Sequence, residues 1–202
     1  MHFESRTQVA KGELSRRRII EAAADQASVR GLAGVSLMDV AESVSLSKSG
    51  VFKHFDSKEA LQTAVVDSVL NRFVEAVWRP ALTQPAGARR LRTILELWLE
   101  WIDRGASGGC PITPFVVEVD DQPGPLRDSL RWQQSLWSKT LRNEFRALRD
   151  PPVDKEEAEQ AAFEFVALTL GYHHRHRLLH DPRAREMTLR AADQLIARVG
   201  GR

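Results

Sequence analysis

Apolar residues recur along this chain at the three- and four-residue spacing of amphipathic helices. They form one stripe in residues 88–104, and the same spacing returns in residues 125–148 and 154–179. Strand signals are few, because the chain has one Tyr, no Asn-Gly turn and no long alternating run of Val, Ile and Thr. The pattern therefore predicts an all-helical protein.

Glycine, proline and short polar runs divide this pattern into segments. The breaks fall at residues 31–34, 45, 56–57, 80–85, 105–114, 120–125, 150–152 and 181–182. They predict about nine helices, three of them short and N-terminal. We expect residues 1–56 to form an N-terminal arm and three-helix domain, and residues 57–202 a helical bundle joined to it by a long fourth helix.

Residues 36–55 predict two short helices separated by a tight turn. The apolar residues of 37–44 fall at i, i+3, i+4 and i+7, and Ser36 with Asp39 forms a start like a capping box. After the turn at residues 45–46, a second helix places Val51 and Phe55 on one face. So short a helix is stable only when packed on its neighbours. Its other faces carry Ser, Lys and an aromatic ring, which suits the major groove of DNA.

Composition and charge add limits to this picture. Of the 202 residues, 43% are apolar, which is enough for a buried core, and the net charge is only +2. No stretch approaches the ~20 apolar residues that cross a bilayer, and the start lacks a secretory signal, so we expect a cytoplasmic protein. Residues 1–18 hold five basic and two acidic residues, which fits a DNA-binding arm or a solvated terminus equally well.

Four segments of the N-terminal region carry a more specific signal. They are IIEAA at 19–23, RG at 30–31, VAE at 40–42 and LSKSGVFKHFDSKEAL at 46–61. Together they resemble the N-terminal signature of TetR/AcrR-type bacterial repressors. The resemblance implies a homodimer of two-domain helical subunits bound to a near-palindromic operator. It also implies that a small molecule entering the C-terminal bundle moves the fourth helix and separates the DNA-binding domains.

The resemblance implies that the second short helix and its surroundings contact DNA. Lys48 would neutralise a phosphate, and Lys58 would act similarly at the start of the fourth helix. Ser36 and Ser47 lie at helix N-termini, which favour phosphate, although helix capping explains both serines as well. The expected DNA-binding residues are Ser36, Ser47, Lys48, Ser49, Gly50, Phe52, Lys53, His54 and Lys58.

Three positions depart from the family pattern. Phe52 stands where Tyr is usual, so the phosphate hydrogen bond of that hydroxyl is absent, although the ring can still pack against sugar. Ser45 stands where the turn usually has Gly, and Gln26-Ala27 replaces a large apolar pair late in the first helix. Phe52, Ser45 and the weak basic excess keep open an alternative, a helical ligand-binding or hydrolytic protein that has lost DNA binding. The retained Lys48 and Lys53 argue against it.

Aromatic and apolar residues of the C-terminal region are candidates for two further roles. Two or three of the aromatic residues are candidates for lining an effector cavity, and a plain core explains them equally well; the candidates are Trp98, Trp101, Phe115, Trp132 and Trp137. The last two helices form the dimer interface in the family. The apolar residues expected there are Phe165, Leu168, Met187, Ala191 and Leu195.

Three weaker patterns are open to simpler explanations. Residues 105–109 match the G-x-S-x-G pattern of a hydrolase with Ser107 as nucleophile, but that motif requires a preceding strand. Histidines 173–180 have a spacing that could hold zinc, although the helix dipole also favours histidine at a C-terminus and no carboxylate partner is evident. Cys110 could sense redox state or be an inert loop thiol.

The sequence thus predicts a DNA-binding transcriptional regulator of the TetR type, most simply a repressor released by a small molecule. We expect no catalytic residues, cofactor or metal site. The expected partners are double-stranded operator DNA, a second copy of the chain and an effector whose identity the sequence does not specify. The operator bases are equally unspecified, because Ser49, Gly50 and Lys53 offer few base-specific pairings.

Overall fold

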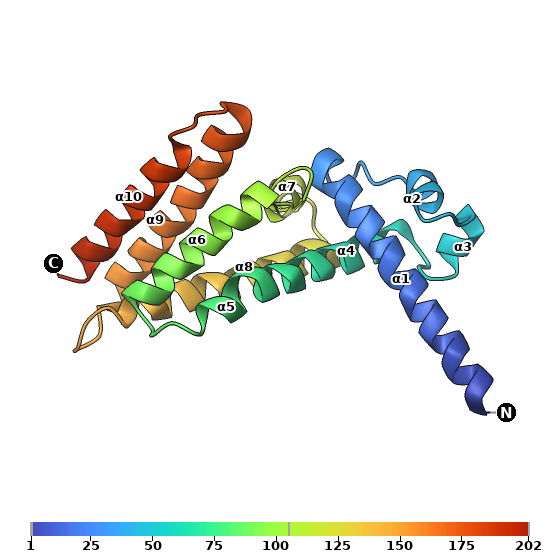
Figure 1. Ribbon diagram of the computed structural model, residues 1–202, viewed down its shortest axis with the longest axis horizontal. Coiled ribbons are helices and arrows are strands. Elements are labelled where there is room, and N and C mark those ends of the chain that lie inside the picture. Colours follow the sequence, from blue (N-terminus) through green and yellow to red (C-terminus); the bar gives the residue numbers. More distant parts are fainter. Residues whose placement is uncertain (1, 105, 202) are drawn as a thin grey trace. The chain divides into compact units, whose positions relative to one another are not determined.

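The computed structural model describes residues 2–104 and 106–201, with side chains described from residue 11 onward. The described residues form helices and no strand, which confirms the predicted all-helical fold (Figure 1). Because α4, η1 and α5 are continuous and α9 continues into η2, these residues form nine continuous helices, as predicted. The elements are α1 (His2–Arg30), α2 (Leu37–Ser43), α3 (Lys48–Phe52), α4 (Lys58–Phe73), η1 (Val74–Trp78), α5 (Arg79–Ala81), α6 (Ala88–Arg104), α7 (Ile112–Val119), α8 (Pro125–Arg146), α9 (Lys155–His173), η2 (His174–Leu178) and α10 (Ala184–Val199).

The helices group into two compact units. The N-terminal unit contains the residues up to Asn71 together with Pro111–Arg127, and the C-terminal unit contains Arg72–Cys110 and Asp128–Arg202. This division differs from the boundary expected at residue 56, because most of α4 and the whole of α7 join the N-terminal helices. The first turns of α4 belong there because Lys58 and Gln62 donate hydrogen bonds to the carbonyl groups of Ala33 and Leu32.

The N-terminal unit is built on the second half of α1. Ile19, Ala23 and Ala27 are fully buried and lie one turn apart, so they form the stripe on which α2 packs. The helix ends at Arg30 because Gly31 takes a left-handed conformation with φ +75° and donates its N–H to the Ala27 carbonyl at 2.9 Å. The chain then turns into α2.

In the C-terminal unit α9 and α10 pack along each other and both contact α6. The predicted stripe of α6 is buried, including Leu91, Ile94 and Ile102. An ion pair of low exposure links α6 to α8, with Arg90 Nη1 2.8 Å from Glu144 Oε1. The same carboxylate accepts the N–H of Gly87 at 3.0 Å, just before α6 begins. No helix in residues 2–104 and 106–201 is long and apolar enough to cross a membrane.

Candidate nucleic-acid interface

The α2–turn–α3 segment forms as the sequence predicts, with a shorter second helix. Ser36 caps α2 by accepting the Asp39 N–H at 3.3 Å, and Ser47 caps α3 by accepting the Gly50 N–H at 3.1 Å. The turn between them is closed by the Leu46 N–H, which donates to the Ala41 carbonyl at 2.9 Å. The second helix ends at Phe52.

Buried residues hold α3 by one face and leave the other face to solvent. Val51 is fully buried and Phe55 is 4% exposed. Around the helix, Ser47, Lys48, Ser49, Phe52 and Lys53 are exposed, whereas Gly50 and His54 are half-buried. Seven of the expected DNA-binding residues therefore lie in residues 47–54. The outer surface of this segment consists of polar and aromatic residues that the sequence analysis had assigned to DNA binding.

The two lysines of this surface differ from Lys58 in their surroundings. Lys48 and Lys53 have no ion-pair partner in the described part of the chain, so their charges are available to an external anion. Lys58 instead donates from Nζ to the Ala33 carbonyl at 2.6 Å. Its ammonium group therefore holds the loop between α1 and α2. Ser36 and Ser47 are likewise engaged as helix caps.

Three arginines that the sequence analysis did not assign to this site brace it. Arg16 of α1 lies over the Phe55 ring, 4.9 Å from its centroid, and Arg18 donates to the Val44 carbonyl at 3.3 Å. Arg30 pairs with Asp39 of α2 at 2.9 Å. The basic excess near the N-terminus thus partly serves to fix α2 and α3. In the sequence, the spacing of these arginines along α1 is the only feature that could have indicated this bracing role.

The turn before α3 accommodates one of the departures from the family pattern, the serine at residue 45. Ser45 lies in the left-handed region, with φ +58°. This region is strained for a residue with a Cβ atom and is readily adopted by glycine. The backbone therefore retains the shape that the usual Gly would give, at the expense of local strain.

Aromatic rings of three helical segments meet within the C-terminal unit. Phe73 contacts Trp98, Trp101 and Trp137 edge to face, with ring centroids 5.3, 5.8 and 5.3 Å away. Trp78 of η1 joins the cluster through Trp137 at 6.1 Å. The indole N–H groups of Trp101 and Trp137 are buried and have no hydrogen-bond acceptor among the residues described. We call these five residues the aromatic cluster.

The aromatic cluster contains three of the five residues expected at an effector site. Trp132 lies on α8 but is 61% exposed, and Phe115 is fully buried on α7, in the N-terminal unit. The sequence analysis did not select Phe73 and Trp78, because they lie on the long helix expected to link the domains. An i→i+5 segment carries Trp78, and such irregular turns often mark functional positions.

The residues expected at a dimer interface divide between the core and the surface. Phe165 is fully buried against Phe145, with ring centroids 5.8 Å apart, and Leu195 is 5% exposed. Both belong to the core of the C-terminal unit. Leu168, Met187 and Ala191 are half-buried. The outer face of α9 carries different apolar residues, since Phe163 is 69% and Leu170 48% exposed, and Ala167 between them is also exposed.

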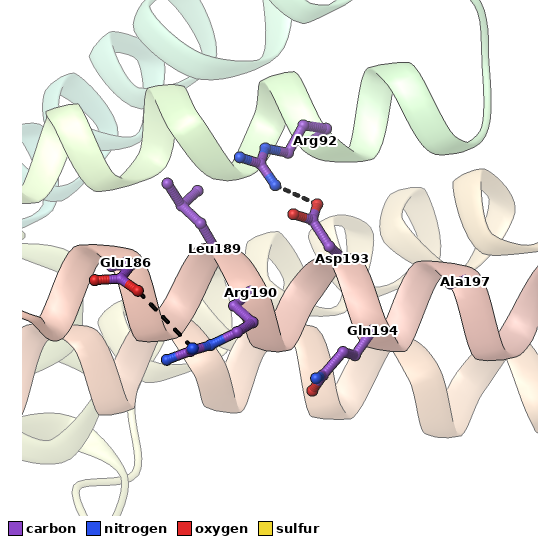
Figure 2. Close-up of a pocket in the computed structure, with 7 residues that line it drawn as sticks. All are labelled: Arg92, Glu186, Leu189, Arg190, Asp193, Gln194 and Ala197. Carbon is purple, nitrogen blue, oxygen red and sulfur yellow. Dashed lines mark hydrogen bonds and ion pairs between the residues drawn. The ribbon is translucent and has the colours of Figure 1, made fainter.

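An open groove of about 520 Å³ runs along α10 beside Arg92 of α6 (Figure 2). Its charged residues face one another. Arg92 pairs with Asp193, and Arg190 lies 3.8 Å from Glu186. The hydrogen bonds to Asp193 and, to a smaller extent, to Glu96 raise the pKa of Arg92. The groove thus has no unpaired charge directed at a ligand.

The region around Ser107 lacks the setting of a hydrolase. Gly105 lies outside the described residues, and helix α6 rather than a strand comes before it. Arg177 donates to the Ser107 carbonyl at 2.9 Å, so residues 106–110 lie on η2. Cys110 at the end of this loop is 3% exposed.

The histidine segment contains one carboxylate contact that the sequence analysis did not foresee. His176 Nε2 lies 3.2 Å from Asp103 Oδ1, and its ring stacks on Tyr172 at 5.1 Å. The Tyr172 hydroxyl also donates to Asp103 at 2.6 Å. Burial, as the main cause, and this hydrogen bond, as the second, raise the pKa of Tyr172 to about 12. Burial lowers the pKa of His173. No group of three or more metal-binding side chains occurs in the described chain.

Two family models match this sequence. Residues 19–65 match the model described as bacterial regulatory proteins of the tetR family, and residues 87–192 match the tetracyclin repressor-like C-terminal domain. The first match contains α2, α3 and the turn between them, and the second runs from α6 into α10. No curated protein is similar at a significant level.

Solved structures with similar folds are regulators from several organisms. A TetR transcriptional regulator from Chloroflexus aurantiacus is 26% identical with a TM-score of 0.79, over 93% of this chain and 96% of the other. A TetR-family regulator from Cytophaga hutchinsonii is 25% identical with a TM-score of 0.76, over 93% and 95%. A TetR-family regulator from Streptomyces coelicolor, 18% identical over 99% and 96% with a TM-score of 0.81, is similar in fold.

Proposed function

Because the chain belongs to the TetR family of bacterial transcriptional regulators, we propose that it is a repressor that binds its operator as a homodimer and leaves it when a small molecule binds the C-terminal unit. The observation that carries the DNA-binding part is the exposed face of α3. It presents polar side chains, two lysines and an aromatic ring on a helix held from behind by Val51 and Phe55.

The chemistry of this face fits the major groove and its flanking phosphates. Lys48 and Lys53 carry charges that no described acidic residue neutralises, and each phosphate contact would release a condensed counterion. Phe52 is 41% exposed and has no hydroxyl, so it contributes an apolar contact to sugar or to a thymine methyl group. The exposed Ser49 hydroxyl shares a hydrogen bond of 2.9 Å with the Ser47 hydroxyl, and it can donate to a phosphate or a base edge when Ser47 is the donor of that bond.

A pair of lysine variants tests this assignment. Lys48→Ala should weaken operator binding and lower the slope of log Kd against log salt by ~0.9 for each protomer that loses a phosphate contact. Lys139→Ala is the matched control, because Lys139 is exposed on α8 in the C-terminal unit and makes no described ion pair. Equal binding by the two variants would contradict the assignment of α3 as the DNA-reading helix.

We place the second copy of the chain on the outer face of α9. Phe163, Ala167 and Leu170 are exposed at spacings of three and four residues and form an apolar stripe. Exposed apolar stripes of this kind mark interaction sites in soluble proteins. Phe165 and Leu195 support the same helices from within, so they affect dimerisation only through the fold of the protomer.

We place the effector at the aromatic cluster of the C-terminal unit. Its rings favour an apolar or amphipathic molecule, and a ligand carbonyl or carboxylate could accept the buried N–H groups of Trp101 and Trp137. Screening small molecules by tryptophan fluorescence and by release from operator DNA tests this placement. For any molecule that releases DNA, Trp137→Phe should weaken the response and Trp132→Phe should not, because Trp132 is exposed and outside the cluster.

A further inference from the structure

The loop between α1 and α2 is held by a carboxylate that comes from far along the chain. Glu118 of α7 accepts the N–H of Leu32 on Oε2 at 2.6 Å, and its Oε1 accepts the N–H of Ala33. Gly31 lies directly against this carboxylate, since a Cβ atom at Gly31 would be 2.7 Å from Glu118 Oε2. The close approach thus depends on the absence of a side chain at residue 31.

The carbonyl groups of the same two residues, Leu32 and Ala33, are held by α4. Gln62 donates from Nε2 to the Leu32 carbonyl at 2.8 Å, and Lys58 donates from Nζ to the Ala33 carbonyl at 2.6 Å. The loop therefore directs its N–H groups to α7 and its carbonyl groups to α4. The Leu32 side chain is 1% exposed, so the loop has little freedom to move independently of these partners.

The position of Glu118 is informative because its charge is unfavourable for α1. A carboxylate near the C-terminus of a helix is repelled by the helix dipole. Glu118 is compensated by the two N–H groups that follow the helix, which form charge-assisted hydrogen bonds with it. Ser36, the cap of α2, follows Ala33 by three residues, so the hydrogen bonds of Glu118 hold the loop directly before α2.

At its other end α7 continues directly from the loop of residues 106–110. That loop belongs to the C-terminal unit and lies on η2, where Arg177 donates to the Ser107 carbonyl and the Arg177 Cδ atom lies 2.6 Å from the Cβ position of Gly109. Pro111 continues this loop into α7, so the chain crosses here from the C-terminal unit to the unit that contains the α1–α2 loop.

We propose that Glu118 is a positioning residue for DNA binding. Through its two hydrogen bonds, α7 sets the α1–α2 loop and thereby the placement of α2 and α3. The proposal rests on the proposed DNA-binding function. It also assigns a role to α7 and Gly31 that contact with DNA alone would not require.

Variants of the full-length protein test the proposal by fluorescence anisotropy on a labelled DNA fragment from immediately upstream of its gene. Glu118→Ala should weaken binding about tenfold, within the usual range of coupling between sites. Glu118→Gln should recover part of this loss, because the amide oxygen still accepts one N–H. Asp121→Ala is the control, since Asp121 is an exposed acid just beyond α7 with no described partner, and it should change binding less than twofold.

Amide hydrogen exchange supplies a readout that does not depend on DNA. The amides of Leu32 and Ala33 should lose protection in Glu118→Ala and keep it in Asp121→Ala, while core amides of α10 remain unchanged in both. Unchanged protection of residues 32 and 33 would overturn the proposal, as would equal DNA binding by the two variants. Wild-type protein that binds this DNA no better than random DNA would overturn the proposed function at this site, whereas the exchange result would still decide whether Glu118 holds the loop.

The linkage between sites also predicts a reciprocal effect. If the Glu118 hydrogen bonds link α7 to the DNA-binding helices, DNA binding by the wild-type protein should alter amide exchange in α7, because a change in the α1–α2 loop acts back on the carboxylate that holds it. Glu118→Ala at saturating DNA should lose this change. A DNA-induced change that persists in Glu118→Ala would show that the coupling runs elsewhere and would overturn the proposal.

Discussion

Replacing Ser45 by Gly should stabilise the N-terminal unit, because Ser45 occupies a backbone region that a Cβ atom makes unfavourable. Its φ is +58°, and its N–H donates to the Glu42 carbonyl at 3.1 Å, so the turn is fixed by hydrogen bonds whichever residue occupies it. A non-glycine residue in this region is strained by about 1–2 kcal/mol. Glycine removes this strain, but it also gives the unfolded chain more conformational freedom, which costs about 0.5–1 kcal/mol of stability. The net gain is about 0.5–1 kcal/mol.

Urea unfolding followed by circular dichroism can measure this gain, with Ser43→Gly as the matched control. Ser43 lies in α2, and its hydroxyl donates to the Val40 carbonyl at 2.8 Å. Glycine there should destabilise by about 1 kcal/mol because it lowers helix propensity. The same substitution two residues apart should therefore shift stability in opposite directions. A loss of stability in Ser45→Gly, or shifts of equal sign in the two variants, would refute the reasoning.

Three further predictions concern the C-terminal unit. Glu144→Ala should lower the free energy of unfolding by about 3–5 kcal/mol, because it removes the carboxylate that pairs with the mostly buried Arg90 and accepts the Gly87 N–H. Glu159→Ala, which breaks a more exposed pair, should change it by at most about 1 kcal/mol, and similar losses in urea titrations would contradict this. Burial lowers the pKa of His173 in the folded protein, so as pH falls the unfolded chain binds a proton at this histidine before the folded protein does. The stability that neutral His173 contributes is therefore present above pH 6.5 and is lost as pH falls through the lower folded pKa. Melting curves should show a smaller loss between pH 7 and 5 in His173→Gln than in the wild type, and parallel losses would refute this. Phe163→Glu should convert a dimer to a monomer of 22.7 kDa by light scattering, and a persistent dimer would exclude the α9 stripe as its interface.

The local structure of the α2–turn–α3 segment could be predicted from sequence because its determinants are local. Ser36 and Ser47 cap the helices that follow them, and the spacing of Val40 and Val51 marks the faces that become buried. Each of these signals lies within a few residues of the structure it specifies. The bounds of α3 were less predictable, because the end of so short a helix depends on packing rather than propensity.

Periodicity could not distinguish the core face of α9 from its outer face. Phe163 and Phe165 are both aromatic and only two residues apart, so they point about 200° apart around the helix. Either could belong to an apolar stripe. Phe165 is buried because Phe145 of α8 packs against it, and no signal within α9 carries that information.

Contacts between distant segments were likewise beyond prediction. Glu118 and Leu32 are 86 residues apart, and neither lies in a motif that indicates a partner. Helix α7 belongs to the N-terminal unit because of such contacts, so a single boundary at residue 56, expected from local sequence patterns, did not include α7 in that unit. The same holds for Phe73, which becomes the centre of the aromatic cluster only because helices far along the chain bring tryptophans to it.

The most direct test of the proposed function is fluorescence anisotropy of the purified protein on labelled DNA from immediately upstream of its gene, with random-sequence DNA as competitor. The titration is repeated at several salt concentrations. The proposed function predicts binding that survives excess competitor and weakens steeply with salt, since several phosphates are neutralised by lysines and arginines. Binding no tighter than to random DNA, confirmed by a selection from genomic fragments that enriches no sequence, would contradict the proposal that this chain is an operator-binding repressor.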